Sequence, residues 1–221
     1  MLPNINFKGI NLVNSNDSGI NSENSAINKI VNNFYDPNIV RILWTGGWDS
    51  TFRVLQLVIE KELTVLPIYL ITTDRTSTDI EIRTINKIKK LTFETFPQTV
   101  GRILPTFFFS VNDLPEYPDI VAKHKALNEP SFLGSQYRPL ACLARYFGLY
   151  DLELGIETRS PGFFTSFVKP LLIKESDGKD YDYRLADEPS NPDLILFKYL
   201  SIHCLSTFEN ADKPLANPTD T

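Results

Sequence analysis

The stretch from Val40 to Thr51, VRILWTGGWDST, decides the fold. Its first five residues are apolar except for one arginine, which predicts a short buried strand. Gly46 and Gly47 predict a turn, because glycine adopts backbone conformations that other residues avoid. From Ser50 to Lys61 apolar residues recur at helical spacing, which predicts a helix with one apolar face. A strand, a glycine turn and a helix in this order predict the beginning of an α/β domain.

The alternation of strands and helices continues beyond this stretch. Further strands are predicted at Val65–Ile71, Leu104–Val111 and Leu152–Ile156, and further helices at 78–96 and 139–147. Because proline cannot donate a hydrogen bond to a ladder, Pro67 is expected at the beginning of its strand or in an edge strand. The alternation predicts a parallel sheet with helices on both faces. Ligands of such sheets bind at the carboxyl ends of the strands.

Both later helices carry start and stop signals. The sequence TDIE from Thr78 to Glu81 matches a capping box, and Pro97 predicts the end of that helix. Pro139 suits the first turn of the next helix, and Gly148 suits its carboxyl-terminal cap.

Three regions of the chain differ in composition. Residues 1–38 are rich in asparagine and serine, which compete with regular structure for backbone hydrogen bonds. We expect a loop-like extension there, with one short helix near Ser25–Phe34. Residues 39–205 form the predicted domain, whose irregular last part contains a hairpin around Asp177-Gly178 and a helix from Leu194 to Leu205. Residues 206–221 are expected to form a loose tail.

The composition is that of a globular protein. The 221 residues are 42% hydrophobic, 22% charged and 12% aromatic, which excludes collagen, a coiled coil and a mostly disordered polymer. The net charge of −5 argues against nucleic acid as a partner. Cys142 and Cys204 are isolated, which predicts neither a disulfide framework nor a cysteine-rich zinc site. Without a signal peptide or a membrane-spanning apolar run, we expect a soluble, cytoplasmic protein.

The segment Thr45–Thr51 combines the features of a polyphosphate site. Its glycines let the backbone approach a ligand, its N–H groups can form an anion nest, and the following helix adds its positive end. Thr45, Ser50 and Thr51 offer hydroxyls to phosphate oxygens, and Asp49 is a ligand suited to Mg²⁺. The spacing matches neither the common P-loop nor the dinucleotide fingerprint. A plain strand-to-helix turn is the alternative.

The same residues resemble the SGGxDS signature of the PP-loop, or N-type ATP pyrophosphatase, superfamily. Thr45 stands in the place of the first serine, and Trp48 occupies the variable position. Two later segments, Tyr137–Leu140 and Leu154–Glu157, resemble the 7-cyano-7-deazaguanine synthase branch of that superfamily, as does the strand that precedes Arg75 and Glu81. The resemblance covers residues 40–157.

This resemblance implies an adenine nucleotide α-hydrolase-like fold that uses ATP and Mg²⁺. Family members split ATP between its α- and β-phosphates, adenylylate an oxygen of the substrate and release pyrophosphate, after which a nitrogen or sulfur nucleophile displaces AMP. For this chain, the implied second substrate is a small acid or amide. Asp49 and Ser50 are the implied catalytic residues, with Asp49 as the Mg²⁺ ligand. The implied nucleotide-binding residues are Thr45, Gly46, Gly47, Asp49, Ser50, Thr51, Thr72, Thr73, Arg138, Gly155 and Glu157.

One departure from the family keeps other functions open. The synthase branch carries a late cysteine cluster that binds zinc, and this sequence has none. A second reading is therefore an ATP- or AMP-binding sensor or scaffold without turnover. A third is a tRNA-modifying relative, which the acidic balance of the chain disfavours. The oligomeric state and a protein partner stay open.

Several single residues also have two interpretations. Trp48 either stacks on a ligand ring or packs locally. Arg75 and Arg138 are either surface arginines or contacts to an anion. Glu81 is predicted to cap its helix rather than to act as a base, and Gly155 permits close approach of either a ligand or another backbone. His124 and His203 lack metal-ligand spacing with the cysteines.

Overall fold

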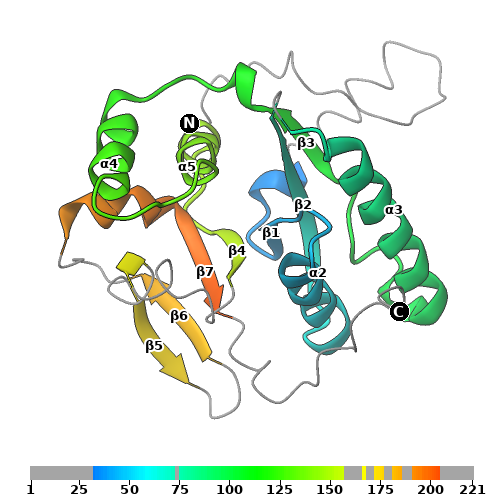
Figure 1. Ribbon diagram of the computed structural model, residues 1–221. Coiled ribbons are helices and arrows are strands. Elements are labelled where there is room, and N and C mark those ends of the chain that lie inside the picture. Colours follow the sequence, from blue (N-terminus) through cyan, green and yellow to red (C-terminus); the bar gives the residue numbers. More distant parts are fainter. Residues whose placement is uncertain are drawn as a thin grey trace, which may run out of the picture.

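The protein is described by a computed structural model (Figure 1). The described residues are 32–72, 75–156, 166–167, 172–176, 181–185 and 191–204. The predicted extension therefore lies outside them except for residues 32–38, of which 32–35 are helical. The predicted tail at 206–221 and the turn of the predicted hairpin lie outside them as well. Within the part of the chain that is described, no helix combines the length and the apolar character needed to cross a membrane.

The described strands form one sheet in the order β3-β2-β1-β4-β7-β6-β5. Strands β3, β2, β1, β4 and β7 pair in parallel, whereas β6 pairs antiparallel with both β7 and β5. This arrangement confirms the predicted α/β class and the predicted hairpin. The strands are β1 Ile39–Leu43, β2 Thr64–Ile71, β3 Phe107–Ser110, β4 Leu152–Ile156, β5 Leu172–Ser176, β6 Tyr181–Leu185 and β7 Leu200–Cys204.

Helices cover both faces of the sheet, as the sequence predicts (Figure 1). The α-helices are α2 Trp48–Leu55, α3 Thr78–Thr95, α4 Pro118–Asn128 and α5 Tyr137–Phe147. Helix α2 continues as one π-helical segment, Gln56–Glu60. Short 3-10 segments lie at Pro97–Thr99, Val111–Asp113 and Pro192–Tyr199. Helices α2 and α3 pack on one face, and α4 and α5 pack on the other.

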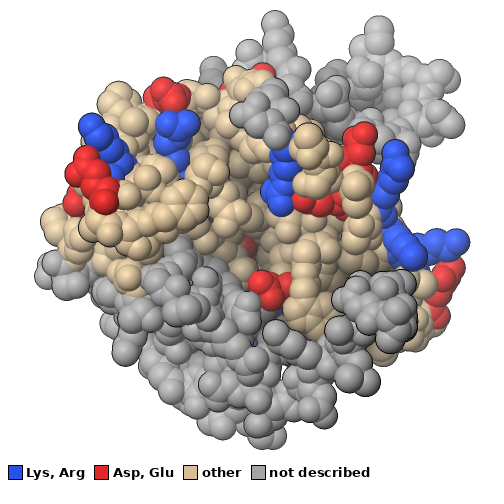
Figure 2. Space-filling view, in the orientation of Figure 1, with Lys and Arg blue, Asp and Glu red and all other residues tan. Residues whose placement is uncertain are grey.

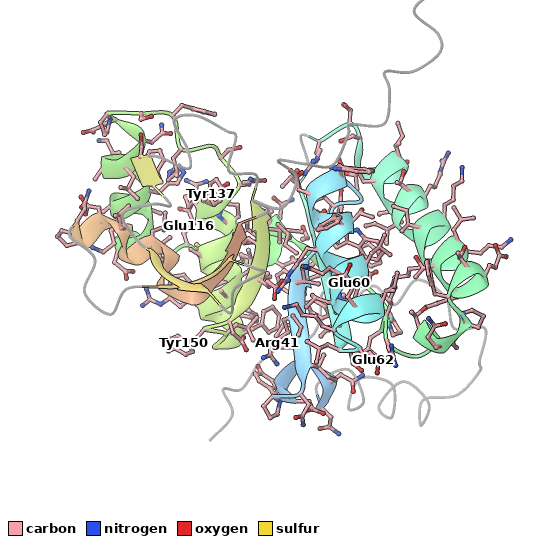
Figure 3. All side chains as sticks on the ribbon, turned by 90° about the horizontal axis from the view of Figure 1, so that it is seen from below. Arg41, Glu60, Glu62, Glu116, Tyr137 and Tyr150 are labelled. Carbon is pink, nitrogen blue, oxygen red and sulfur yellow. The ribbon has the colours of Figure 1, made fainter. Side chains whose placement is uncertain are left out.

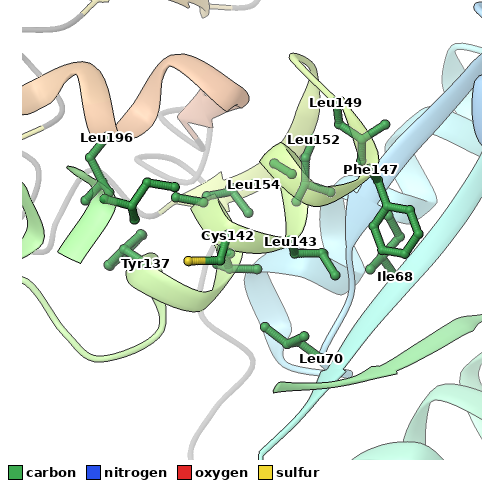
Figure 4. Packing of buried hydrophobic residues seen from close by; sticks show 14 of the residues in the cluster. Ile68, Leu70, Tyr137, Cys142, Leu143, Phe147, Leu149, Leu152, Leu154 and Leu196 are labelled. Atoms are coloured by element: carbon green, nitrogen blue, oxygen red, sulfur yellow. The ribbon is translucent and has the colours of Figure 1, made fainter. Parts of the chain in front are cut away.

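The core on the α5 face is built from alternate strand residues. Ile68 and Leu70 of β2 lie against Leu143 and Phe147 of α5, with Leu154 of β4 beside them (Figure 4). The aromatic residues that the sequence concentrates in β3 join this core. The ring centroids of Phe107 and Phe147 are 5.5 Å apart, in an edge-to-face arrangement that aromatic pairs favour.

The intervening strand residues form a second core under α2 and α3. Trp44 and Tyr69 are fully buried there and pack with Val54 of α2 and Ile85 of α3. Because successive strand residues point to opposite faces, burial on both faces explains why β1 and β2 read as nearly continuous apolar runs.

Pro67 does not lie where the sequence predicted. It is the fourth of eight residues in β2, which is an inner strand paired with β1 and β3. Backbone bonds of Val65 point toward the β3 side, so by alternation the nitrogen of Pro67 also faces that side. Continuous pairing with β3 begins only at Ile68, opposite Phe107. The missing N–H therefore falls in a gap between the isolated bridge at Ile103 and β3.

Other element boundaries also differ from the predictions. Helix α2 begins at Trp48 rather than at Ser50, and α4 was not predicted. The predicted helix from Leu194 to Leu205 is wrong in its second half, because residues 192–199 form a 3-10 helix and β7 follows. Residues 200–204 pair in parallel with β4, and a short apolar run does not distinguish such a strand from a helix.

Candidate functional site

The glycine loop joins β1 to α2 at the carboxyl end of an inner parallel strand. Gly46 has φ +74°, a left-handed conformation that side chains disfavour. A Cβ at Gly46 would also lie 3.3 Å from the backbone oxygen of Glu81 and 3.3 Å from Cγ1 of Ile85, both in α3. Glycine is therefore required at this position for two independent reasons. The backbone N–H of Thr51 donates to the oxygen of Gly47, the N-cap residue of α2, at 3.0 Å.

Strand β4 touches the other side of the loop. A Cβ at Gly155 would lie 3.3 Å from the backbone oxygen of Asp49 and 3.6 Å from the Cα of Ser50. Gly155 thus permits close packing of β4 on the first turn of α2, which is one of its two sequence interpretations. The loop is held between α3 and β4, and its backbone is fixed from both sides.

A cleft of about 190 Å³ opens between the loop and α5. One wall is polar and comes from the loop, through Thr45, Asp49 and Ser50. The opposite wall includes Leu140 and Leu154, which belong to α5 and β4. The complete lining is Leu43, Thr45, Gly47, Trp48, Asp49, Ser50, Gln136, Tyr137, Leu140, Leu154 and Gly155.

Two of the three hydroxyl residues of the loop, Thr45 and Ser50, line the cleft. The Oγ1 of Thr45 and the Oγ of Ser50 are 3.5 Å apart, and Ser50 donates to the oxygen of Gly47 at 3.3 Å. Thr51 lies outside the lining, and its Oγ1 accepts a 2.9 Å bond from the indole N–H of Trp44. This bond ties α2 to the buried Trp44, and the phosphate contact of Thr51 stays a prediction.

Trp48 lines the cleft with its side chain directed largely toward solvent. It is 63% exposed, although an apolar side chain of this size is usually buried. Its exposure argues against packing into either core. Stacking of Trp48 on a ligand ring stays a prediction.

Several predicted site residues are not brought to the cleft. Thr72 follows β2 and is not part of the lining. Arg138 is 46% exposed in its side chain, and its Nη1 lies 3.7 Å from Oε1 of Glu116. In Figure 3 both Glu116 and Tyr137 lie on the side of the molecule formed by α4 and α5. Thr73 and Glu157 lie outside the described residues.

Five lining residues were not predicted: Leu43, Gln136, Tyr137, Leu140 and Leu154. Tyr137 begins α5, and burial raises its pKa to about 12. Its hydroxyl therefore stays protonated at neutral pH and is able to donate a hydrogen bond. The position of Gln136 and Tyr137 at the start of a helix that precedes an inner strand was a usable signal, because that end of α5 faces the carboxyl ends of the strands.

A buried ion pair lies beneath the cleft. Nε of Arg53, one turn beyond Asp49 in α2, donates to Oε1 of Glu153 in β4 at 2.5 Å. Both side chains are at least 90% buried. Arg53 also donates to Oε1 of Gln56 at 2.6 Å, where the π-helical segment begins. The pair links α2 to β4 two residues before Gly155.

Glu81 does not form the predicted capping box. Ser77 is the N-cap of α3, so Glu81 occupies the fourth helical position, and its carboxylate turns to side chains instead. Its Oε2 accepts from the hydroxyl of Tyr69 at 2.8 Å, and its Oε1 accepts from Oγ of Ser77 at 2.7 Å. Nη2 of Arg75 lies 2.9 Å from the same Oε1. We call Tyr69, Arg75, Ser77 and Glu81 the Glu81 cluster.

The other potentially reactive side chains that the structure describes, Cys142 and His124, lie in surroundings typical of a structural role. Burial raises the pKa of Cys142, which is opposite to the shift that activates a thiol. Nε2 of His124 lies 3.1 Å from the backbone oxygen of Gly134. The side chains of His203 and Cys204 are not described.

A magnesium ion would find one protein carboxylate at the cleft. Among the described lining residues, Asp49 is the carboxylate, and no group of three described His, Cys, Asp or Glu residues gathers elsewhere into a metal site. One carboxylate fits Mg²⁺ that arrives with phosphate oxygens and water, because Mg²⁺ usually keeps such ligands.

On the face shown in Figure 2, the described residues form no continuous stripe of basic side chains of the kind that binds nucleic acid. Figure 2 shows basic and acidic side chains of the described residues beside one another toward the edges of this face, with mostly uncharged residues between them.

Comparison with protein-family models and with curated proteins finds no match for this chain. The resemblance to PP-loop ATP pyrophosphatases thus stays a prediction from the loop and its surroundings.

Proposed function

We propose that this protein binds Mg-ATP at the glycine loop and cleaves it to AMP and pyrophosphate while adenylylating a small acid or amide. The observation that carries the proposal is the loop itself. It joins an inner parallel strand to a helix, it is fixed between Glu81 and Gly155, and it borders a cleft with hydroxyls and one carboxylate. These are the groups that a polyphosphate with Mg²⁺ requires.

Each part of the loop has a separate role in this proposal. The N–H groups at the beginning of α2 stabilise the negative charge that develops on the leaving pyrophosphate. Thr45 and Ser50, whose hydroxyl oxygens are 3.5 Å apart, donate to phosphate oxygens and hold the triphosphate of ATP in one orientation. Asp49 would hold Mg²⁺, which supplies charge neutralisation of the phosphates when bound.

The apolar wall of the cleft suits the parts of ATP and of the second substrate that carry little charge. Leu140 and Leu154 are nearly fully buried and exclude water from one side of the cleft. An adenylylated acid hydrolyses easily, so a water-poor wall protects it until the nucleophile arrives. The proposed nucleophile is a nitrogen or sulfur compound, which displaces AMP from the activated oxygen.

Product analysis tests the reaction directly. The protein is incubated with Mg-ATP and a panel of small carboxylic acids and amides, and AMP, ADP and pyrophosphate are quantified. We expect AMP and pyrophosphate in equal amounts from the wild type and at least about a hundredfold less from Asp49→Asn. The matched control is Asp193→Asn, because Asp193 lies outside the described lining of the cleft and its Oδ1 lies 3.9 Å from Nζ of Lys123. Release of ADP and phosphate would contradict the proposal.

A second candidate is nucleotide binding without turnover. Among the described residues that line the cleft there is no lysine or arginine, whereas phosphate-transfer sites commonly use one. The two candidates separate in the same assay. Saturable Mg-ATP binding with no AMP from any substrate in the panel would favour a sensor or scaffold.

A further inference from the structure

We propose that Arg75 is the cation of the nucleotide site, stored on Glu81 while the site is empty and transferred to the phosphate chain when ATP binds. The inference rests on the proposed nucleotide binding and deepens it, because it names the side chain that supplies positive charge. Neither the described lining of the cleft nor the segment Thr45–Thr51 contains such a group.

A positive side chain is needed because the cleft has the wrong sign by itself. Its described lining carries the Asp49 carboxylate and no lysine or arginine. ATP remains a polyanion after it binds one Mg²⁺, and it would meet only hydroxyls and N–H groups there. Arginine binds phosphate oxygens through two parallel N–H bonds, which is the strongest side-chain contact available to such a ligand.

Arg75 is coupled to the loop through Glu81. The backbone oxygen of Glu81 lies where a Cβ of Gly46 would come within 3.3 Å, so the first turn of α3 supports the loop. The carboxylate of the same residue holds Nη2 of Arg75 at 2.9 Å, and Nε of Arg75 donates to Oγ of Ser77 at 3.3 Å. Arg75 is thus held by the residue that touches the loop. Arg138, in contrast, pairs with Glu116 next to the opposite wall.

Release of Arg75 from Glu81 costs little. The side chains of Arg75 and Glu81 are 41% and 16% exposed, and ion pairs that water reaches contribute little to stability. After Arg75 leaves, the Glu81 carboxylate still accepts hydrogen bonds from Tyr69 and Ser77. The carboxylate is therefore not left as a buried group without donors, and exchange of Glu81 for a phosphate as the partner of Arg75 is favourable.

The exchange predicts opposite effects for the two partners of the ion pair. We expect Arg75→Gln to weaken Mg-ATP binding by about ten- to a hundredfold, and to weaken AMP binding much less, because AMP lacks the β- and γ-phosphates. Arg75→Lys should restore part of the affinity as a point charge. Glu81→Gln keeps a hydrogen-bonding side chain of the same size but removes the competing charge, so Mg-ATP should bind as tightly as to the wild type or more tightly.

Calorimetric titration of these variants with Mg-ATP and with AMP tests the proposal, with Arg83→Gln, an exposed arginine of α3 outside the cleft lining, as the matched control. A purely structural Glu81 cluster would instead make Glu81→Gln bind more weakly, in parallel with Arg75→Gln. That result, or wild-type affinity in Arg75→Gln while Asp49→Asn has lost binding, would overturn the role of Arg75 and leave the proposed function intact. Failure of the folded wild type to bind Mg-ATP would overturn both.

Discussion

Gly155 of β4 lies so close to α2 that a Cβ on it would be 3.3 Å from the backbone oxygen of Asp49. The residue that would hold Mg²⁺ is therefore positioned by a strand about a hundred residues later in the chain. Beneath this contact, the buried pair of Arg53 and Glu153 joins the same two elements. The geometry of the loop thus depends on β4 as much as on its own glycines.

Gly155→Ala should displace the first turn of α2. The new Cβ at 3.3 Å from backbone atoms is tighter than most real contacts, so α2 must move by a few tenths of an ångström. We expect Mg-ATP affinity to fall about tenfold with a loss of about 1 kcal/mol in the free energy of unfolding, measured by calorimetry and urea denaturation. Wild-type affinity in this variant would mean that contact with β4 does not position the loop.

Gly46→Ala should be more damaging, because Gly46 has φ +74° in addition to its contact with Glu81. We expect a loss of about 2–3 kcal/mol in the free energy of unfolding and no measurable Mg-ATP binding. Gly148→Ala is the matched control for both glycine variants. Gly148 has φ +66° at the far end of α5, and a Cβ there meets nothing within 4 Å. It should lose only about 1 kcal/mol and keep wild-type affinity.

Removal of one partner from the buried pair of Arg53 and Glu153 should lower the free energy of unfolding strongly. Arg53→Met leaves the carboxylate of Glu153 buried without its guanidinium partner, and we expect a loss of about 3–5 kcal/mol in urea denaturation. The double variant Arg53→Met with Glu153→Leu removes both charges and should recover most of that loss. Equal destabilisation by the single and the double variant would show that the charges themselves are not the reason for the cost.

Lys89 gives the protein a pH-dependent stability in the alkaline range. Burial lowers the pKa of Lys89 from its ordinary 10.5 to about 8. Its Nζ donates to the oxygen of Leu104 at 2.9 Å and to Oγ1 of Thr106 at 2.8 Å, and it lies 5.9 Å from the ring centroid of Trp44. Between pH 8 and 10.5 the unfolded chain keeps a proton that the folded protein has released, so this residue makes stability rise with pH across that window.

Substitution of Lys89 isolates this contribution from other titrating groups. Urea denaturation of the wild type and Lys89→Met is compared at several pH values from 7 to 10.5. We expect the stability of Lys89→Met relative to the wild type to decrease by up to about 3 kcal/mol over this range, because the burial penalty disappears from the wild type as Lys89 loses its proton. A pH-independent difference would show that Lys89 is charged in the folded protein throughout.

Local patterns predicted much of this fold. The strand at Ile39–Leu43, the glycine loop and α2 follow from apolar periodicity and two glycines, and Gly148 marks the end of α5 through its left-handed conformation. The sequence also singled out Thr45 and Ser50, which line the cleft, because their placement depends on their position relative to α2. These features are determined by residues close together in the chain.

Features that depend on distant residues were missed. The bond between Thr51 and Trp44 was not predicted, since it depends on how α2 lies over β1. Glu81 matched a capping box, yet its partner Tyr69 comes from β2. The apolar wall of the cleft joins α5 to β4, and no local motif shows which helix faces which strand.

The central claim is that the glycine loop binds the phosphates of Mg-ATP, and titration calorimetry tests it most directly. The wild type is titrated with ATP in the presence and absence of Mg²⁺, beside Asp49→Asn and the control Asp193→Asn. We expect micromolar binding that requires Mg²⁺, is lost in Asp49→Asn and is kept in Asp193→Asn. Absence of binding by the folded wild type, or equal binding by Asp49→Asn, would contradict the claim.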